Sequence, residues 1–391
     1  MRIGLSTSVI QRGHSGVGQY VLALVRALAA APGPHEFTLY VLEEDMPLFS
    51  FAASGIRLVP VPERHRPPVK NILWHQTELP RLVRQARLDV LHVPSYRRLL
   101  WPRPCALVAT IHDLAPFRLP EKYDWKRMVY GRVVVRRLAR RQDEIIAVSR
   151  ATADDLHAFF GLSPQQVTVI HNGLDHDRFT PGNRAEARAG IAQRHGLRHP
   201  FFLYVSRLEH PAKNHARLIE AFNRFKTATR SPWLLALGGS DWHGAEAIHA
   251  LIRQSPFSDD IFRLGFVPPE DLPAWYRAAG AFVYPSLFEG FGMPPLEAMA
   301  CGCPVVTATG AALGEVVGNA AQPVDPLSIS DIERQLARIA GDDALRERLR
   351  SAGLTHARRF DWNRTAAATL EVYARAAAGI VSEPVTRPAW G

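Results

Sequence analysis

The sequence predicts an α/β protein with two doubly wound parallel sheets, one in each half of the chain. Short runs rich in Val, Ile, Leu and Phe recur in both halves. Their apolar character is continuous, which is typical of strands buried on both faces. Helical patterns separate the runs, and such alternation favours parallel sheets covered by helices. The pattern restarts near residue 200, so two separate sheets are expected.

The apolar runs give the expected strands. In the first half they cover residues 3–9, 37–42, 56–61, 90–93, 106–111, 145–148 and 167–170. In the second half they cover residues 201–205, 233–237, 261–267, 281–284 and 304–307. Helical faces lie between them, because Tyr20, Leu24 and Leu28 recur at helical spacing, as do Leu218, Phe222 and Phe225.

The length of 391 residues suits two domains. A polar stretch at residues 181–199 contains Pro181 and Gly182 and predicts a boundary between a Rossmann-like domain at 1–180 and a second at 181–360. Asp361 is a suitable N-cap for a helix over residues 361–380. Residues 381–391 are expected to form a flexible tail.

The net charge is +10, of which residues 1–180 carry about +8. A basic half indicates an anionic partner, and nucleic acid, anionic lipid and diphosphate all qualify. The alternative is a general preference for Arg over Lys in the coding sequence. The basic residues are densest at 121–141, where aromatic and apolar side chains are interleaved. A basic, apolar helix is typical of docking on an anionic membrane, although a solvated helix face fits equally well.

Cysteine usage and hydropathy exclude several classes of protein. Cys105, Cys301 and Cys303 form no disulfide framework, and no second Cys/His pair accompanies Cys301 and Cys303 as metal ligands. We therefore expect small, buried cysteines. No apolar run approaches the length of a transmembrane helix, and the first residues lack a signal-peptide core. These patterns predict a cytoplasmic protein, with membrane association left open.

Residues 288–297, Phe-Glu-Gly-Phe-Gly-Met-Pro-Pro-Leu-Glu, follow an expected strand and open a helix. A loop that leads into a helix start presents N–H groups suited to phosphate or sugar oxygens. Glu289 lies near the end of the strand and Glu297 in the expected first helical turn, so both can accept hydrogen bonds from hydroxyl groups. A Glu placed there only to complement the helix dipole is the alternative.

A second loop, residues 206–214, also follows an expected strand and contains Arg207 and Lys213. Two cations at a strand end can neutralise a departing diphosphate, whereas isolated basic residues are usually solvated. The glycine loop at residues 13–18 leads from the first strand into a helix, although it lacks the full dinucleotide fingerprint. His112 ends another strand and can act beside a reacting group or be a satisfied structural histidine.

Asp175 and Asp177 have a spacing that can hold a divalent metal. Because they follow Asn172 and Gly173 near the expected domain boundary, a turn or hinge is favoured. No metal site is therefore expected in this chain.

Together these motifs resemble the family-four retaining glycosyltransferases of the GT-B fold over about residues 1–375. The paired Glu289 and Glu297, and Arg207 with Lys213, look like that family's glutamate and diphosphate motifs. Residues 169–175 resemble its interdomain segment. Residues 360–362 are similar to the start of its C-terminal helix, which crosses back to the first domain.

The resemblance implies two Rossmann-like domains facing each other across a cleft, with acceptor binding on the N-terminal side. Glu297 would hold the ribose, and Arg207 and Lys213 the diphosphate. His112 would lie beside the transferred sugar. Glu289 would contact the same sugar, together with the backbone of Phe291, Gly292 and Met293. Gly16 would approach the diphosphate from the first domain, but this loop lacks the adjacent glycines common in the family.

The implied reaction is metal-independent hexosyl transfer with retention, from a nucleotide diphosphate sugar to a saccharide or a lipid-linked saccharide of a surface polysaccharide. The residues do not distinguish GDP-mannose from UDP-glucose as donor. A sugar-nucleotide epimerase on the same fold is one alternative. A basic lipid- or nucleic-acid-binding protein is another, but it would have no use for the glutamate motif, so no nucleic-acid partner is expected.

Overall fold

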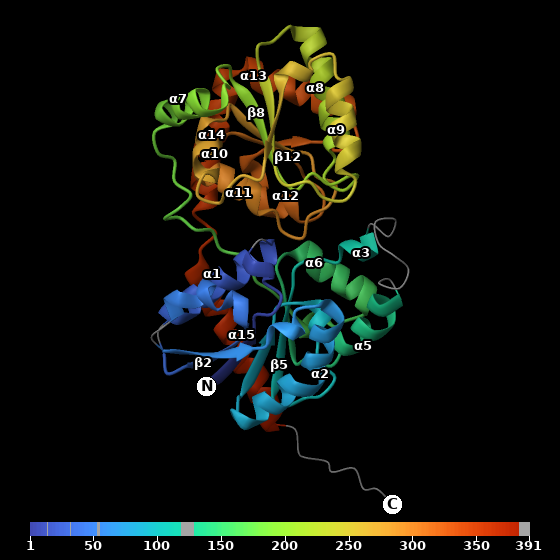
Figure 1. Ribbon diagram of the computed structural model, residues 1–391, viewed down its shortest axis with the longest axis vertical. Helices are drawn as coiled ribbons and strands as arrows, with labels where there is room; N and C mark the ends of the chain where they lie inside the picture. Colours follow the sequence, from blue (N-terminus) through green and yellow to red (C-terminus); the bar gives the residue numbers. More distant parts are fainter. Residues whose placement is uncertain (14, 32, 53–54, 119–128, 383–391) are drawn as a thin grey trace, which may run out of the picture. The chain divides into compact units, whose positions relative to one another are not determined.

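The computed structural model describes residues 1–391 except 14, 32, 53–54, 119–128 and 383–391. The chain divides into two compact units (Figure 1). Unit 1 combines Met1–Gly173 with the helix that begins at Trp362, and unit 2 is Leu174–Asp361. The sequence placed the boundary at residues 180 and 181, whereas the contacts divide the chain between Gly173 and Leu174.

Unit 1 contains a parallel sheet in the order β3-β2-β1-β4-β5-β6-β7. Its strands are β1 Arg2–Ser6, β2 Glu36–Leu42, β3 Ile56–Val61, β4 Val90–Val93, β5 Ala106–Ile111, β6 Glu144–Ala147 and β7 Val167–Val169. Its α-helices are α1 Gly16–Ala30, α2 Pro68–Gln85, α3 Ala115–Arg118, α5 Arg136–Ala139, α6 Arg150–Asp155 and α15 Trp362–Ser382. Short 3-10 helices cover Gln11–Gly13, Glu43–Ala52, Glu63–His65, Tyr96–Arg98 and Pro164–Gln166, and π-helices cover Tyr130–Val135 and Leu156–Phe160.

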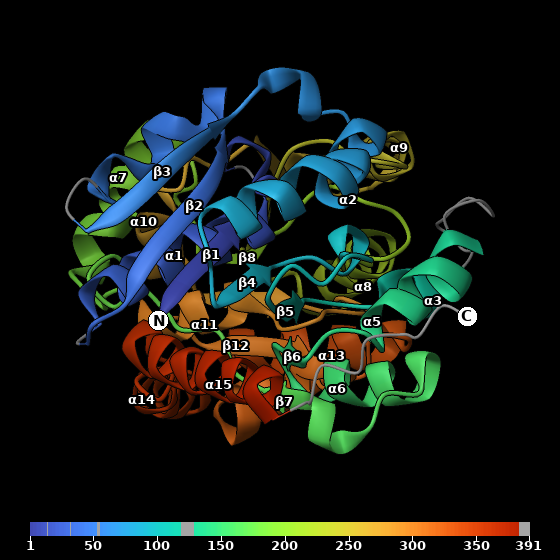
Figure 2. The ribbon, with the colours of Figure 1, turned by 90° about the horizontal axis from the view of Figure 1, so that it is seen from below.

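Helices cover both faces of this sheet because alternate strand residues point in opposite directions. On β5, Ala106 and Val108 pack into a core that also contains α1 and α15. The intervening Leu107 and Ala109 point to the opposite face, where α2 and the helices around α5 and α6 supply the packing. Figure 2 shows α15 along the sheet, and it contacts α1, β4, β5 and β6. The C-terminal helix therefore completes unit 1, as the resemblance implied.

Unit 2 contains a second parallel sheet, in the order β10-β9-β8-β11-β12-β13. Its strands are β8 Phe201–Val205, β9 Leu234–Gly238, β10 Ile261–Gly265, β11 Ala281–Tyr284, β12 Val305–Ala308 and β13 Gln322–Val324. Its α-helices are α7 Arg184–His195, α8 His215–Thr229, α9 Ala245–Gln254, α10 Leu272–Ala278, α11 Met293–Ala300, α12 Ala312–Val317, α13 Ile329–Gly341 and α14 Asp343–Ala357. Two 3-10 helices cover Ser258–Asp260 and Gly318–Ala320.

Both sheets reverse their strand order at one point, between β1 and β4 in unit 1 and between β8 and β11 in unit 2. Ligands of doubly wound sheets bind beyond the carboxyl ends of the strands at this switch point. The two Rossmann-like sheets confirm the predicted fold class. Each predicted strand overlaps an observed one, and β13 was missed because Gln322 and Pro323 give it little apolar character.

The structure can also be compared with other expectations from the sequence. The polar stretch at 181–199 contains a helix, α7. The three cysteines are free and buried, as predicted. No helix among the described residues is long and apolar enough to cross a membrane. The expected flexible tail lies outside the described residues except for Val381 and Ser382, which end α15.

A buried polar network ties α15 to the sheet of unit 1. The His92 ring nitrogens lie 2.7 Å from the Tyr373 hydroxyl and 2.8 Å from the Thr110 hydroxyl. The Thr110 hydroxyl lies 3.1 Å from that of Tyr20 on α1. Burial lowers the pKa of His92 to about 3. A neutral imidazole can donate through one nitrogen and accept through the other, as this network requires.

We expect acid to destabilise unit 1 through His75, His92 and His112, whose pKa values burial lowers to about 3, 3 and 4. The unfolded chain protonates these histidines near pH 6.5, so the free energy of unfolding is constant above that pH and falls below it toward pH 4. The loss is up to about 1.4 kcal/mol per histidine and pH unit. Urea unfolding at pH 7.5 and 5.5 measures it. His92→Gln should make the pH dependence shallower, whereas His195→Gln, at an exposed histidine of unit 2, should leave it unchanged.

Candidate active site

The loop after β8 brings Lys213 to the switch point of unit 2. The Tyr204 hydroxyl donates to the Lys213 carbonyl at 2.6 Å. The next residue, Asn214, donates from its side chain to the carbonyls of Pro285 and Pro326 at 2.9 and 2.6 Å. Pro285 directly follows β11. These bonds therefore fasten the β8 loop to the β11 loop and fix the position from which the Lys213 side chain extends.

The loop after β11 supplies Glu289, which pairs with Lys213. Lys213 Nζ lies 2.6 Å from Glu289 Oε1, and both side chains are only 15% exposed. The Tyr284 hydroxyl donates to the same oxygen at 2.8 Å. Burial alone would raise the pKa of Glu289, but the Lys213 charge and hydrogen bonds from Lys213, Ser286 and Tyr284 leave it below its usual value. Glu289 is therefore an ionised, largely buried carboxylate at neutral pH.

The backbone at the start of α11 is held in an unusual conformation by glycine. Gly292 has φ +105°, and a Cβ there would lie 2.6 Å from a Leu313 methyl carbon. Phe291 is buried, edge-on to Phe360 with ring centres 6.0 Å apart. Pro294 and Pro295 occupy the second and third helix positions and have no N–H. N–H donors at this helix start must therefore come mainly from Met293 and the loop before it.

Glu297 is the fifth residue of α11, and no acid lies in the first turn. The prediction that Glu297 lies in the first turn is wrong, because Gly292 allows the helix to begin at Met293, before the two prolines. The helix dipole is therefore a weaker explanation for this carboxylate. Tyr276 donates to Glu297 Oε2 at 2.9 Å. Burial raises the pKa of Glu297, against the opposing effects of the Tyr276 hydrogen bond and the Arg178 charge.

Arg207 lies on the same loop as Lys213 but has other neighbours. Its guanidinium lies over the Trp242 ring, 4.8 Å from the ring centre, and Nη2 is 3.4 Å from Glu209 Oε2. Glu209 is fully buried, whereas about half of the Arg207 side chain is exposed. Trp242 thus supports one face of a guanidinium whose outer edge can reach a ligand.

In unit 1, the glycine loop leads into α1 as expected. Ser15 caps the helix and accepts a hydrogen bond from Gly18 N at 3.0 Å. A Cβ at Gly18 would lie 2.4 Å from the Ile10 carbonyl oxygen, whereas no atom of the described residues lies within 4 Å of the Cβ position of Gly16. Gly18 is therefore required by packing within the loop, and Gly16 has the open side that a ligand can approach.

His112 directly follows β5 at the carboxyl edge of the unit 1 sheet. Tyr20 contacts its ring edge-on, with ring centres 4.6 Å apart. Its Nε2 atom is buried and has no hydrogen-bond partner among the described residues. Burial lowers the pKa of His112 to about 4, so the imidazole is neutral at pH 7. A neutral ring with an unsatisfied nitrogen is suited to a polar interaction with a substrate hydroxyl.

Asp175 forms a local turn. Its Oδ1 accepts hydrogen bonds from Asp177 N and Arg178 N at 3.1 and 3.0 Å, in agreement with the expected turn. Within the described part of the chain, no group of three His, Cys, Asp or Glu side chains is arranged to hold a metal ion.

Sequence reasoning missed the aromatic residues around the site. Tyr284 could have been suspected because it is the last residue of a predicted strand before the glutamate loop. Tyr276 and Trp242 had no comparable signal, because α10 and the β9 loop carry no motif that we had singled out. These residues matter only through the side chains that they meet in the folded protein.

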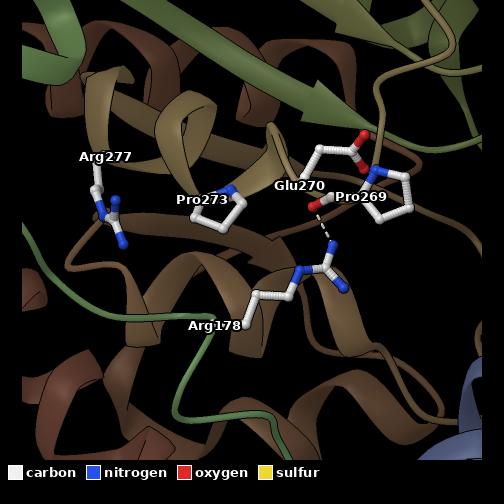
Figure 3. A pocket seen from close by; sticks show the side chains of 5 residues that line it. All are labelled: Arg178, Pro269, Glu270, Pro273 and Arg277. Atoms are coloured by element: carbon white, nitrogen blue, oxygen red, sulfur yellow. Dashed lines mark hydrogen bonds between the residues drawn. The ribbon is translucent and has the colours of Figure 1, made fainter.

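A separate cavity of about 520 Å³ in unit 2 is lined by residues that the sequence did not single out: Arg178, Pro269, Glu270, Pro273 and Arg277 (Figure 3). Arg178 donates to the Pro269 carbonyl across it. The expected site residues do not line this cavity. The charge of Arg178 nevertheless acts on Glu297, where it opposes the rise in pKa caused by burial.

Comparison with known proteins identifies the family. Residues 14–178 match the family described as Glycosyltransferase Family 4, and residues 191–356 match Glycosyl transferases group 1. The chain belongs to glycosyltransferase family 4. It is a member of a retaining family with the GT-B fold.

Two curated relatives match this GT4 glycosyltransferase over most of their length. O-antigen chain mannosyltransferase B of Escherichia coli is 28% identical, with 95% of this chain and 99% of the relative covered. D-inositol 3-phosphate glycosyltransferase of Xylanimonas cellulosilytica is 29% identical, with 92% of each covered. Among solved structures, Anabaena Alr3699/HepE in complex with UDP and glucose has a TM-score of 0.75 at 19% identity, with 96% of this chain and 99% of that chain covered.

Proposed function

We propose that this GT4 enzyme transfers a hexose to a saccharide chain of a surface polysaccharide. The proposed hexose is mannose, and its donor is GDP-mannose. The acceptor chain is carried on a lipid, and the reaction takes place in the cytoplasm. The Lys213–Glu289 pair at the switch point of unit 2 carries the proposal, because it places a cation and a carboxylate where a doubly wound sheet binds ligands. The near full-length similarity to an O-antigen mannosyltransferase favours mannose over glucose.

The diphosphate, the ribose and the sugar of the nucleotide sugar each have a proposed partner in unit 2. Lys213 retains N–H donors beyond the one directed at Glu289, and these would bind the diphosphate together with Arg207. Glu297 Oε2 accepts from Tyr276, which leaves Oε1 for a ribose hydroxyl. Glu289 and the backbone from Phe291 to Met293 would contact the sugar. No resident metal is required, because these cations would stabilise the leaving diphosphate.

Unit 1 would supply the acceptor side of the reaction. Gly16, with its open Cβ position, would let a phosphate approach the start of α1, and His112 Nε2 would bond to a hydroxyl of the transferred sugar. The acceptor oxygen would form its bond to the anomeric carbon on the face from which the diphosphate oxygen departs. The acceptor proton would pass to that phosphate oxygen. Attack on the same face retains the anomeric configuration.

A panel of nucleotide sugars with a lipid-linked saccharide acceptor tests the function. We expect GDP-mannose to give a lengthened α-linked product and UDP-glucose to give much less. If product formed only with UDP-glucose, the proposed donor would be wrong, but the enzyme would still be a glycosyltransferase. An epimerised sugar released without acceptor would overturn the transferase assignment.

Trp242→Ala should weaken binding of GDP and of inorganic pyrophosphate about two- to tenfold, the range of a cation–π contact, because Arg207 would lose the ring that supports it. Trp242→Phe should restore part of the affinity. Trp101→Ala is a matched control, since Arg141 lies over Trp101 in unit 1. Isothermal titration calorimetry measures the change, and equal affinities for Trp242→Ala and wild type would remove this role.

EDTA should leave the transfer rate unchanged, because Lys213 and Arg207 are proposed to carry out the charge neutralisation for which other transferases use a divalent cation. Initial rates with and without chelator, and after addition of Mn²⁺, measure this. Strict dependence on Mn²⁺ would contradict the assignment of these two cations.

A further inference from the structure

Exposed apolar side chains of the described residues gather in one region of unit 1. Six of the ten large ones belong to α2, to the segment before β5, and to the π-helix that precedes α5 together with the residue before that helix: Val69, Leu73, Trp101, Val129, Val133 and Val134. Val69, Leu73 and Trp101 are 70%, 57% and 60% exposed. Large apolar side chains that cluster outside the core usually mark an interaction surface.

Side-chain contacts join these elements into one surface. The Gln76 side chain, on the α2 face that carries Leu73, accepts from Trp101 N at 2.8 Å and donates to Leu99 O at 2.9 Å. Arg141 lies over the Trp101 ring at 3.8 Å. The Tyr130 hydroxyl donates to Arg97 O at 3.4 Å, which holds the π-helix against the same segment. Both α2 and α5 cover the sheet face opposite α1 and α15.

The same surface is basic. Arg136 and Arg140 turn toward the Phe160 carbonyl, so Arg137 and Arg141 lie on a different side of the helix, and Arg141 meets Trp101. Val133 precedes Arg137 by one helical turn. Lys70 is exposed between Val69 and Asn71 on α2. Apolar side chains thus alternate with cations, which suits the interface of an anionic bilayer.

The surface adjoins the functional edge of unit 1. Asn71, two residues from Val69 and Leu73, accepts a hydrogen bond from Ser8, just beyond β1, at 3.3 Å. His75 on α2 lies 2.9 Å from the Ser6 hydroxyl, at the carboxyl end of β1. The carboxyl edge of this sheet also carries Gly16 and His112. A membrane held here would lie beside the edge at which unit 1 is proposed to bind its acceptor.

We propose that the protein docks on an anionic lipid membrane through one surface of unit 1, the Trp101 surface. This surface consists of Val69, Leu73, Trp101, Val133, Arg137 and Arg141. This inference rests on the proposed function, since a membrane presents the lipid-linked acceptor. It extends the membrane contact expected at residues 121–141 to α2 and Trp101. The described part of that segment supplies Val133, Arg137 and Arg141, and residues 121–128 lie outside the described residues. The apolar groups enter the lipid interface, and the arginines pair with lipid phosphates.

Co-sedimentation of the full chain with vesicles tests the proposal. Phosphatidylcholine vesicles with added phosphatidylglycerol should bind the protein, pure phosphatidylcholine should bind it much less, and added NaCl should release it. Arg137→Glu/Arg141→Glu should weaken binding at least about tenfold, given about fivefold for each basic residue near the surface. Leu73→Ser/Trp101→Ala should weaken it by a similar factor, and Leu327→Ser, an exposed leucine of unit 2, should not change it.

Activity on a short, lipid-free saccharide acceptor separates this inference from the proposed function. The surface variants should keep that activity and lose transfer to a lipid-linked acceptor in vesicles. If every surface variant still bound vesicles like the wild type, or if the protein bound neutral and anionic vesicles equally, the membrane role would be overturned. The transferase assignment would remain intact. Self-association that the same substitutions abolish would assign the surface to a second copy and would also overturn it.

Discussion

Lys213→Ala should lower kcat about 100- to 1000-fold, the usual effect of removing one group that stabilises charge in a transition state. Lys213 is the only lysine within 3 Å of Glu289 among the described residues, and its remaining N–H groups are proposed to meet the leaving diphosphate. The donor Kd should change less than kcat, because charge on the leaving oxygen grows as the sugar departs. Steady-state rates with saturating donor measure the loss.

A folding defect must be separated from this loss. Lys213→Ala leaves the Glu289 carboxylate buried with only hydroxyl partners, and an uncompensated buried charge is costly. Lys213→Arg keeps the charge and should retain more activity than Lys213→Ala. Arg224→Ala, at an exposed residue of α8, is the control for a lost surface cation. A near-normal rate for a folded Lys213→Ala protein would exclude the leaving-group role.

Glu297→Ala should raise the donor Kd about 10- to 100-fold, because a hydrogen bond to a charged group contributes about 1.5–3 kcal/mol. The ribose takes no part in bond breaking, so kcat at saturating donor should fall much less than kcat/KM. Calorimetry with GDP measures the affinity without any acceptor. Glu297→Gln keeps one acceptor oxygen and should have intermediate affinity.

The position of Glu297 allows a second check. Tyr276→Phe removes the hydroxyl that holds Oε2 and should weaken GDP binding by a smaller factor than Glu297→Ala. Glu347→Ala, at an exposed glutamate of α14, should have wild-type affinity. An unchanged GDP affinity in Glu297→Ala would show that this carboxylate does not hold the ribose, and its role would then be confined to packing against α10.

The alternation of apolar runs and helical faces was enough to predict the two sheets, because strands buried on both faces must be apolar throughout. It also placed Arg207, Lys213, Glu289 and His112 after predicted strands. Since parallel strands end at one edge, residues that follow different strands could be expected to gather there. The missed β13 shows the limit, because a three-residue edge strand with a proline has no apolar run.

The sequence by itself therefore determined the fold class and the edge of each sheet at which the candidate site residues lie. Only the tertiary structure decided the partners: Lys213 meets Glu289 across 76 residues, Arg207 meets Trp242, and Arg141 meets Trp101. The physical reason is that spacing along the chain sets the direction of a side chain within its own element. Which elements become neighbours depends on strand order and on the packing of helices against the sheet, and these emerge only when both faces of the sheet are covered.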